Sequence, residues 1–219
     1  MSRALSRSLP LLLVLLASPA RGQVWAPSAT FPDRVQALSV DPSDPARIYA
    51  GTKVGVYATS DGGATWNPAS SGLTQPDVRA LAIDPVAPSV LYAGTKNGVF
   101  KSVDRAASWM PTAPVLDPDV RSLAVSPAGG WVLAGTKKGV SRSTDGGASW
   151  VPANAGLGNL EVRSLAADPN NPATVYAGTK QGVFKSVDGG LSWTAASSGL
   201  GGREVRALAV GPLDPSLVV

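Results

Sequence analysis

The stretch from Val162 to Trp193 reads VRSLAADPNNPATVYAGTKQGVFKSVDGGLSW, and its landmarks recur along the chain at a period of about 42 residues. The first landmark, Val-Arg-Ser/Ala-Leu, begins at Val78, Val120, Val162 and Val205, with Val35-Gln36-Ala37-Leu38 as an earlier copy. The second, Ala-Gly-Thr-Lys, begins at Ala50, Ala93, Ala134 and Ala177. The third is a turn that ends on Trp66, Trp109, Trp150 or Trp193. Three landmarks in one order indicate a repeat architecture.

Each repeat divides into four short apolar runs separated by turn residues. In the repeat that begins at Val78, the runs are 78–83, 90–93 and 99–102, and the last one starts at Trp109. Four antiparallel strands in about 40 residues are typical of a β-propeller blade, and no window has the period of a helical solenoid. The sequence predicts an all-β propeller of four-stranded antiparallel blades, with repeats at 35–77, 78–119, 120–161 and 162–204 and a partial fifth at 205–219.

The two ends of the chain carry incomplete repeats. The fifth repeat stops where its Ala-Gly-Thr-Lys landmark would follow, so we expect the chain to be a piece of a longer propeller. At the other end, Trp25-Ala26-Pro27 resembles Trp66-Asn67-Pro68 and Trp150-Val151-Pro152. We expect it to be an outer strand donated to the last blade, which would remove an exposed sheet edge.

Residues 1–22 have the pattern of a secretory signal peptide, with arginines, a short apolar run from Leu9 to Ala17 and a small-residue cleavage site. The apolar run is too short for the alternative, a transmembrane anchor. The mature chain, 23–219, is expected to be exported to a bacterial periplasm or cell exterior without stable membrane insertion. Removing Arg3, Arg7 and Arg21 lowers the net charge from +4 to +1, so a nucleic-acid partner is not expected. Cysteine is absent, so core packing must hold the fold.

The tryptophan-ended turns resemble the Asp boxes of bacterial neuraminidase-type (BNR) repeats, within the wider WD40/YVTN/BNR-like propeller superfamily. That superfamily holds sialidases, xyloglucan-hydrolysing endoglucanases and photosystem II assembly and stability factors. The resemblance implies a structural role for the box residues, with tryptophans largely buried at blade edges. These residues are Asp61, Gly63, Trp66, Asp104, Trp109, Asp145, Gly147, Trp150, Asp188, Gly190 and Trp193. Arg105 and Ala106 replace the glycines of the second box, which puts its turn geometry in question.

The chain lacks the side chains of most catalytic and metal sites. Histidine and cysteine are both absent, and we expect no cofactor and no metal. Each tyrosine or glutamate that a sialidase-like site would use has a counterpart in another repeat, so no catalytic residue is predicted. Asp117 and Asp119 are the best carboxylate pair for the alternative, a glycoside hydrolase whose catalytic blades are incomplete in this chain.

A basic face follows from strand direction, because the start of the first strand and the turn between the second and third strands lie at the same end of a blade. This end collects Arg79, Arg121, Arg163 and Arg206 with Lys53, Lys96, Lys137 and Lys180. We predict an exported, non-catalytic module that binds a protein or polyanionic partner through this face, with a glycan as a further candidate partner. The photosystem II factors, which the repeats resemble, bind a partner through an arginine-rich face. The alternative for the arginines is internal pairing with the acids two residues before them, at Asp77, Asp119, Glu161 and Glu204.

Overall fold

The computed structural model describes residues 33–211, which form four antiparallel four-stranded sheets, named blades 1 to 4 in chain order. Blade 1 contains β1 (Val35–Asp41), β2 (Asp44–Thr52), β3 (Gly55–Thr59) and β4 (Asn67–Pro68). Blade 2 contains β5 (Val78–Ile83), β6 (Leu91–Thr95), β7 (Gly98–Ser102) and β8 (Met110–Pro111). Blade 3 contains β9 (Ser122–Val125), β10 (Val132–Thr136), β11 (Gly139–Ser143) and β12 (Val151–Pro152). Blade 4 contains β13 (Val162–Asp168), β14 (Asn171–Thr179), β15 (Gly182–Ser186) and β16 (Thr194–Ala195).

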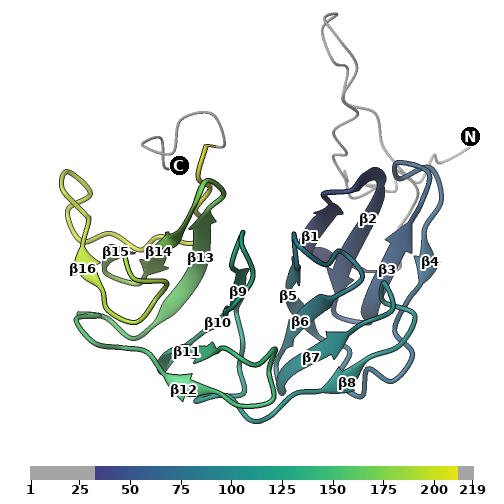
Figure 1. Ribbon diagram of the computed structural model, residues 1–219, viewed down its shortest axis with the longest axis horizontal. Coiled ribbons are helices and arrows are strands. Elements are labelled where there is room, and N and C mark those ends of the chain that lie inside the picture. The colour runs from purple at the N-terminus through teal and green to yellow at the C-terminus, as the bar shows by residue number, and fades with distance from the viewer. Residues whose placement is uncertain (1–32, 212–219) are drawn as a thin grey trace, which may run out of the picture.

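The blades stand side by side along an open arc, with the first strand of each blade innermost and the fourth strand at the periphery (Figure 1). Strand β5 packs between β1 and β9, and β9 packs against β13. This arrangement confirms the predicted fold class, a β-propeller of four-stranded antiparallel blades. The described part of the chain contains no helix long and apolar enough to span a membrane.

The glycine of each Ala-Gly-Thr-Lys segment lets the next blade approach closely. A Cβ atom on Gly51 would lie 2.7 Å from Cγ1 of Val78, and one on Gly94 would lie 2.6 Å from Cγ1 of Val120. Both valines are fully buried. The first landmark of one repeat therefore packs on the second landmark of the repeat before it, which explains why the two recur together.

Beyond blade 4, the chain starts to follow the path of a further inner strand. The Val205 N–H donates to the Thr179 carbonyl (2.8 Å), as the Val120 N–H donates to that of Thr95 (3.0 Å). Residues 203–211 are assigned to none of the four sheets. The predicted signal peptide (1–22), the predicted strand at Trp25–Pro27 and the end of the fifth repeat (212–219) lie outside the described residues.

The fourth strands are shorter than the four to six residues that the apolar runs predict, since β4, β8, β12 and β16 have two residues each. In the first three of these strands the second residue is a proline, Pro68, Pro111 or Pro152. A proline has no N–H to donate to a sheet ladder, and it is confined to edge strands or strand ends. The proline is not what sets this length, because β16 has none and is equally short, and in every blade the next residue still donates its N–H to the third strand.

The Asp boxes form tight turns closed by their aspartates. In blade 3, Asp145 accepts hydrogen bonds from the Ser149 backbone N–H (2.9 Å) and from Ser143 Oγ (2.8 Å). Gly147 has a φ of 93°, which residues with a side chain rarely adopt. In blade 2, Arg105 and Ala106 take φ values of 59° and 66°. The bonds between Asp104 and Ser108 are kept there, so the turn forms without its glycines.

The box aspartates make the stability of the fold depend on pH. Hydrogen bonds from Ser149 and Ser143 lower the pKa of Asp145 to about 2. Because this value lies below the unfolded pKa of about 3.9, ionised Asp145 stabilises the fold above about pH 4, and this contribution is lost as the pH falls to about 2. We expect Asp145→Asn to lower the thermal unfolding midpoint at neutral pH and to flatten its decline between these values. Circular dichroism melts measured across this range test this, and parallel profiles for parent and variant would contradict it.

Two of the box tryptophans are buried against the blade before them. Trp109 and Trp193 are each 2% exposed. The indole N–H of Trp109 donates to the Ala69 carbonyl (2.8 Å), and that of Trp193 donates to the Ala153 carbonyl (2.9 Å). These two side chains therefore join blade 2 to blade 1 and blade 4 to blade 3.

The other two box tryptophans, Trp66 and Trp150, are partly buried, less completely than Trp109 and Trp193. Trp150 packs against the linker after blade 2, where its indole N–H donates to the Thr112 hydroxyl at 3.3 Å. This linker, between Trp109 and Val120, is one residue shorter than the linker between Trp66 and Val78. It also has no counterpart of the Gly72-Leu73 turn. Burial of a box tryptophan therefore depends on the loop that receives it.

Candidate binding face

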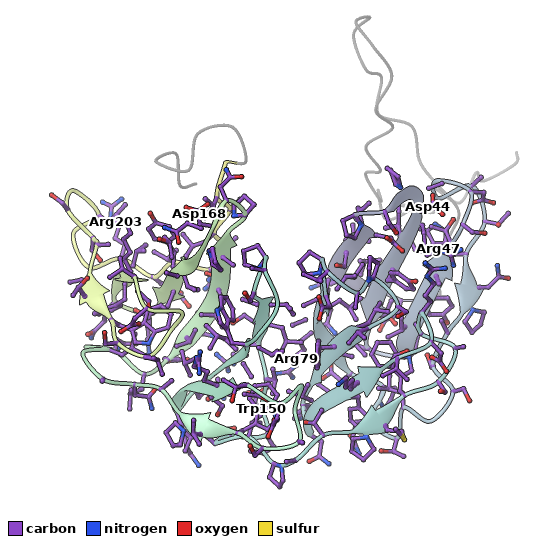
Figure 2. All side chains as sticks on the ribbon, viewed as in Figure 1. Asp44, Arg47, Arg79, Trp150, Asp168 and Arg203 are labelled. Carbon is purple, nitrogen blue, oxygen red and sulfur yellow. The ribbon has the colours of Figure 1, made fainter. Side chains whose placement is uncertain are left out.

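The inner strands turn the repeated arginines out of the sheets. The pairing register of β5 shifts between Val78 and Ala80, so Arg79 is an extra residue, and β1 and β13 shift likewise at Gln36 and Arg163. Such a bulge redirects a side chain relative to the regular pleat. Figure 2 shows Arg79 on the inner side of the arc, between blades 2 and 3.

A cavity of about 480 Å³ opens at this inner rim, and it is lined by one position of five successive repeats: Gln36, Arg79, Arg121, Arg163 and Arg206. The first of these residues is the only departure from arginine, and its Nε2 donates to Asp77 Oδ1 at 2.8 Å. The cavity therefore presents the guanidinium groups of the repeat, while the carboxylates that pair with them are not among its lining residues.

The arginines form a continuous ion-pair ladder with the acids that precede the inner strands. Each of the first three arginines pairs with the acid two residues before it and with the acid two residues before the next arginine. The pairs are Arg79 with Asp77 (3.1 Å) and Asp119, Arg121 with Asp119 (3.3 Å) and Glu161 (3.3 Å), Arg163 with Glu161 (2.6 Å) and Glu204 (3.2 Å), and Arg206 with Glu204 (3.0 Å). This arginine ladder links each blade to the next, and a role of its arginines in partner binding stays a prediction.

The lysines of the same face extend further into solvent. Lys137 Nζ lies 3.6 Å from Asp119, and Lys180 Nζ lies 3.7 Å from Glu161, with the two side chains 52% and 62% exposed. Lys53 and Lys96 make no ion pair with any residue between 33 and 211. Four ladder carboxylates thus face eight cations, and the basic face, defined as the arginine ladder with Lys53, Lys96, Lys137 and Lys180, carries an excess of positive charge.

The carboxylates at the two ends of the ladder, Asp77 and Glu204, have lowered pKa values. Burial opposes ionisation of Asp77, but hydrogen bonds from Gln36 and Arg79 and the charges of Arg79 and Lys53 outweigh it and lower its pKa. At the other end of the ladder, the hydrogen bond from Arg206 lowers the pKa of Glu204. The arginines at the two ends of the ladder therefore favour the ionised form of these two carboxylates.

The two weak catalytic candidates belong to this same network. Asp119 contacts Arg79 through one carboxylate oxygen and Arg121 and Lys137 through the other. Asp117 is 9% exposed, accepts a hydrogen bond from the Asp119 backbone N–H (2.9 Å) and lies 3.9 Å from Lys138 Nζ. In this arrangement both carboxylates are engaged by groups of the chain itself.

Sequence reasoning missed a second set of cations at the Asp-box end. Lys101 Nζ donates to the Gly146 carbonyl (3.0 Å), and Arg142 Nε donates to the Gly189 carbonyl (3.0 Å). Each cation reaches from the third strand of one blade to the Asp box of the next. The signal was present, because Lys101, Arg142 and Lys185 occupy one repeat position.

No protein-family model matches the chain, and no curated protein matches it. Among solved structures, an ancestral GH74 enzyme is similar with a TM-score of 0.71 and 21% identity over 87% of this chain and 29% of its own. The GH74 xyloglucanase from Xanthomonas campestris is similar with a TM-score of 0.69 and 20% identity over 82% of this chain and 32% of its own. The structure of YCF48 bound to D1 peptide is similar with a TM-score of 0.62 and 19% identity over 84% of this chain and 62% of its own. The chain therefore spans about a third of the GH74 enzymes and less than two thirds of YCF48. At these identities the likeness establishes the fold, and residues 33–211 of the chain form a β-propeller arc of four four-stranded blades.

Proposed function

We propose that this chain is a non-catalytic binding propeller, exported from the cell, that holds an acidic segment of a partner protein on its basic face. The observation that carries the proposal is the charge count of that face, where eight cations meet four ladder carboxylates around a cavity lined by arginines. A concave site with an excess of one charge attracts ligands of the opposite charge and speeds their association.

The arginines and the lysines of the basic face have different roles in this proposal. The arginines are already paired within the chain, and the side chains of Arg79, Arg121 and Arg163 are 28%, 15% and 28% exposed. The lysines are more exposed, and each can move toward a ligand without breaking a link between blades. We therefore assign the adjustable contacts with the partner to the lysines and the shape of the cavity to the arginines.

The structural likeness to YCF48, which has been solved bound to D1 peptide, supports a peptide-binding role for a propeller of this shape. The likeness to GH74 enzymes supports the alternative, a glycoside hydrolase. Binding is favoured because the only carboxylate pair that the sequence singled out, Asp117 and Asp119, is engaged by cations and backbone of the chain itself.

Replacing Lys53, Lys96, Lys137 and Lys180 together by glutamine is expected to weaken binding of an acidic probe, a poly-glutamate peptide, by about tenfold or more, since each exposed pair contributes roughly 0.2–1 kcal/mol. Binding of the parent should also weaken as salt rises. Isothermal titration calorimetry at two salt concentrations measures both effects. Unchanged melting curves would show that the fold tolerates the replacement.

The matched control replaces the same four lysines by arginine, which keeps the charges and should keep the binding. Equal affinity of parent and glutamine variant, or binding of the parent that ignores salt, would contradict the proposal. If the proposal holds, pull-downs from an envelope extract with the parent, the glutamine variant and the arginine variant would identify the natural partner. Hydrolysis of xyloglucan by the parent would favour the glycoside hydrolase instead.

A further inference from the structure

Three arginines of the basic face form a row with one guanidinium per blade junction. Arg79, Arg121 and Arg163 occupy one repeat position, and each is held by two ladder carboxylates, which fixes its side chain relative to the blades. Arg79 and Arg121 each donate to these acids from both terminal nitrogens. Because a guanidinium has five N–H donors, each still has donors that residues 33–211 leave unused. All three side chains line the cavity, so a ligand there can reach them.

Positive charge recurs with the same period along this row. The two central ladder carboxylates, Asp119 and Glu161, are each surrounded by two arginines and one lysine. Around the first of them, these cations are Arg79, Arg121 and Lys137. One carboxylate cannot neutralise three cations, so each of these junctions keeps an excess of positive charge. The basic face is therefore a series of anion-attracting points that follow the blades.

The spacing of these points follows from how the blades pack. Sheets that face each other lie about 10 Å apart. The inner strands are at least this close here, because β5 and β9 have Cα atoms within 8 Å of each other, as do β9 and β13. A single carboxylate also spans the gap between the guanidinium groups of Arg79 and Arg121. Successive arginines are therefore about 8–10 Å apart along the inner rim.

This spacing matches one regular backbone form of a bound peptide. An extended β-strand presents one face at every second residue, about 6.6 Å apart, which is too short. An α-helix needs two turns, about 11 Å long and about 10 Å wide, and such a cylinder is larger than a cavity of about 480 Å³. Polyproline II has three residues per turn and a rise of about 3.1 Å, so every third residue returns to one face about 9 Å further along. Acidic residues at every third position of such a segment therefore match the row.

We propose that the basic face binds a polyproline II segment of the partner protein in which three acidic residues recur at every third position. This inference rests on the proposed function, the binding of an acidic segment, and adds the period and the backbone form of that segment. The three carboxylates contact Arg79, Arg121 and Arg163 in turn, and Lys137 and Lys180 close over them. Because the blades stand along an arc (Figure 1), a longer straight segment would leave the curved rim. Prolines between the acids hold the backbone in this form before binding, which lowers the entropy cost of association.

Three peptides of one composition test the period. Each contains three glutamates and six prolines with blocked ends, and the glutamates occupy every third position, every second position or three consecutive positions. The parent should bind the first peptide at least about fivefold more tightly than the other two, because misplaced acids lose ion pairs. A fourth peptide with glycine in place of proline keeps the period and should bind about fivefold more weakly than the first, since its backbone is flexible. Nuclear magnetic resonance titrations at low salt, followed by amide shifts, measure the four dissociation constants.

Lys137→Gln and Lys138→Gln form a matched pair of variants for the same titrations. Both remove one positive charge, but Lys137 lies 3.6 Å from the ladder carboxylate Asp119, whereas Lys138 lies 3.9 Å from Asp117. The preference for the periodic peptide should fall in the first variant and persist in the second.

The outcomes separate this proposal from the proposed function. Equal, salt-sensitive affinity of the parent for the three isomeric peptides overturns the period and leaves the binding of acidic segments standing. A glycine peptide that binds as tightly as the periodic proline peptide overturns the backbone form. Failure of the parent to bind any of these peptides or poly-glutamate at low salt contradicts the proposed function, and the period with it.

Discussion

Trp193→Ala is expected to lower the free energy of unfolding by about 3–5 kcal/mol, the usual cost of truncating a buried large aromatic side chain. Trp193 is 2% exposed and packs in one cluster with Leu133, Leu157 and Phe184. It also supplies two hydrogen bonds to the linker of blade 3, through its backbone and its indole. The substitution would leave a cavity between blades 3 and 4 and an unpaired carbonyl at Ala153.

Trp150→Ala provides the comparison, because Trp150 has the same position in its repeat but is only partly buried. Its indole N–H makes a single long hydrogen bond, to Thr112 Oγ1 at 3.3 Å. With less apolar area removed from water, its loss should cost about 1–2 kcal/mol. Urea unfolding of both variants with an unchanged m-value measures the difference. Equal losses would show that the loop at Ala153–Leu157, which receives Trp193, contributes nothing beyond the tryptophan itself.

Arg121→Gln should destabilise the fold by about 1–3 kcal/mol, because it removes one of the cationic partners of each of two partly buried carboxylates. The Arg121 side chain is 15% exposed and bridges Asp119, two residues before it, and Glu161, two residues before the next arginine. Without the guanidinium, these two carboxylates lose a shared hydrogen-bond donor. Arg206→Gln should change stability by less than about 0.5 kcal/mol, since Arg206 is 81% exposed and pairs with one carboxylate.

A double-mutant cycle with Glu161→Gln isolates the contact between blades. The coupling between Arg121 and Glu161 should be favourable and should fall with added salt. Thermal and urea unfolding of the two single variants and the double variant supply the four corners of the cycle. If Arg121→Gln and Arg206→Gln have equal effects, the ladder does not link the blades.

Most of the fold could be predicted because neighbouring repeats make the same contact in turn. The glycine of Ala-Gly-Thr-Lys and the valine of Val-Arg-Ser/Ala-Leu are written once per repeat, and they meet across each junction, as Gly51 meets Val78. The packing between blades can therefore be predicted from residues that recur once in each repeat. The strand lengths were less predictable, because all four fourth strands have two residues whether or not they contain a proline.

The candidate site was predictable in its composition and only partly in its pairing. The alternating strand direction predicted that the arginines and lysines lie at one end of the blades. The spacing of two residues predicted the acids before each arginine as possible partners. It did not show that Arg79 reaches Asp119, in the linker before blade 3, as well as Asp77, in the linker before its own blade. Gln36, which begins the ladder, drew no prediction because its repeat departs from arginine there.

The sequence by itself determined the propeller class, the Asp-box turns and the face on which the cations gather, since each depends on local patterns repeated at a constant spacing. Only the tertiary structure decided which tryptophans are buried and that each of the first three arginines bridges two repeats. Those outcomes depend on distances of a few ångströms between groups about 40 residues apart, where hydrogen bonds and ion pairs form only with the right separation and alignment. The linker between blades 2 and 3 is one residue shorter than the linker between blades 1 and 2, and it contacts Trp150. This difference changes the separation of the interacting groups without disturbing the repeat pattern.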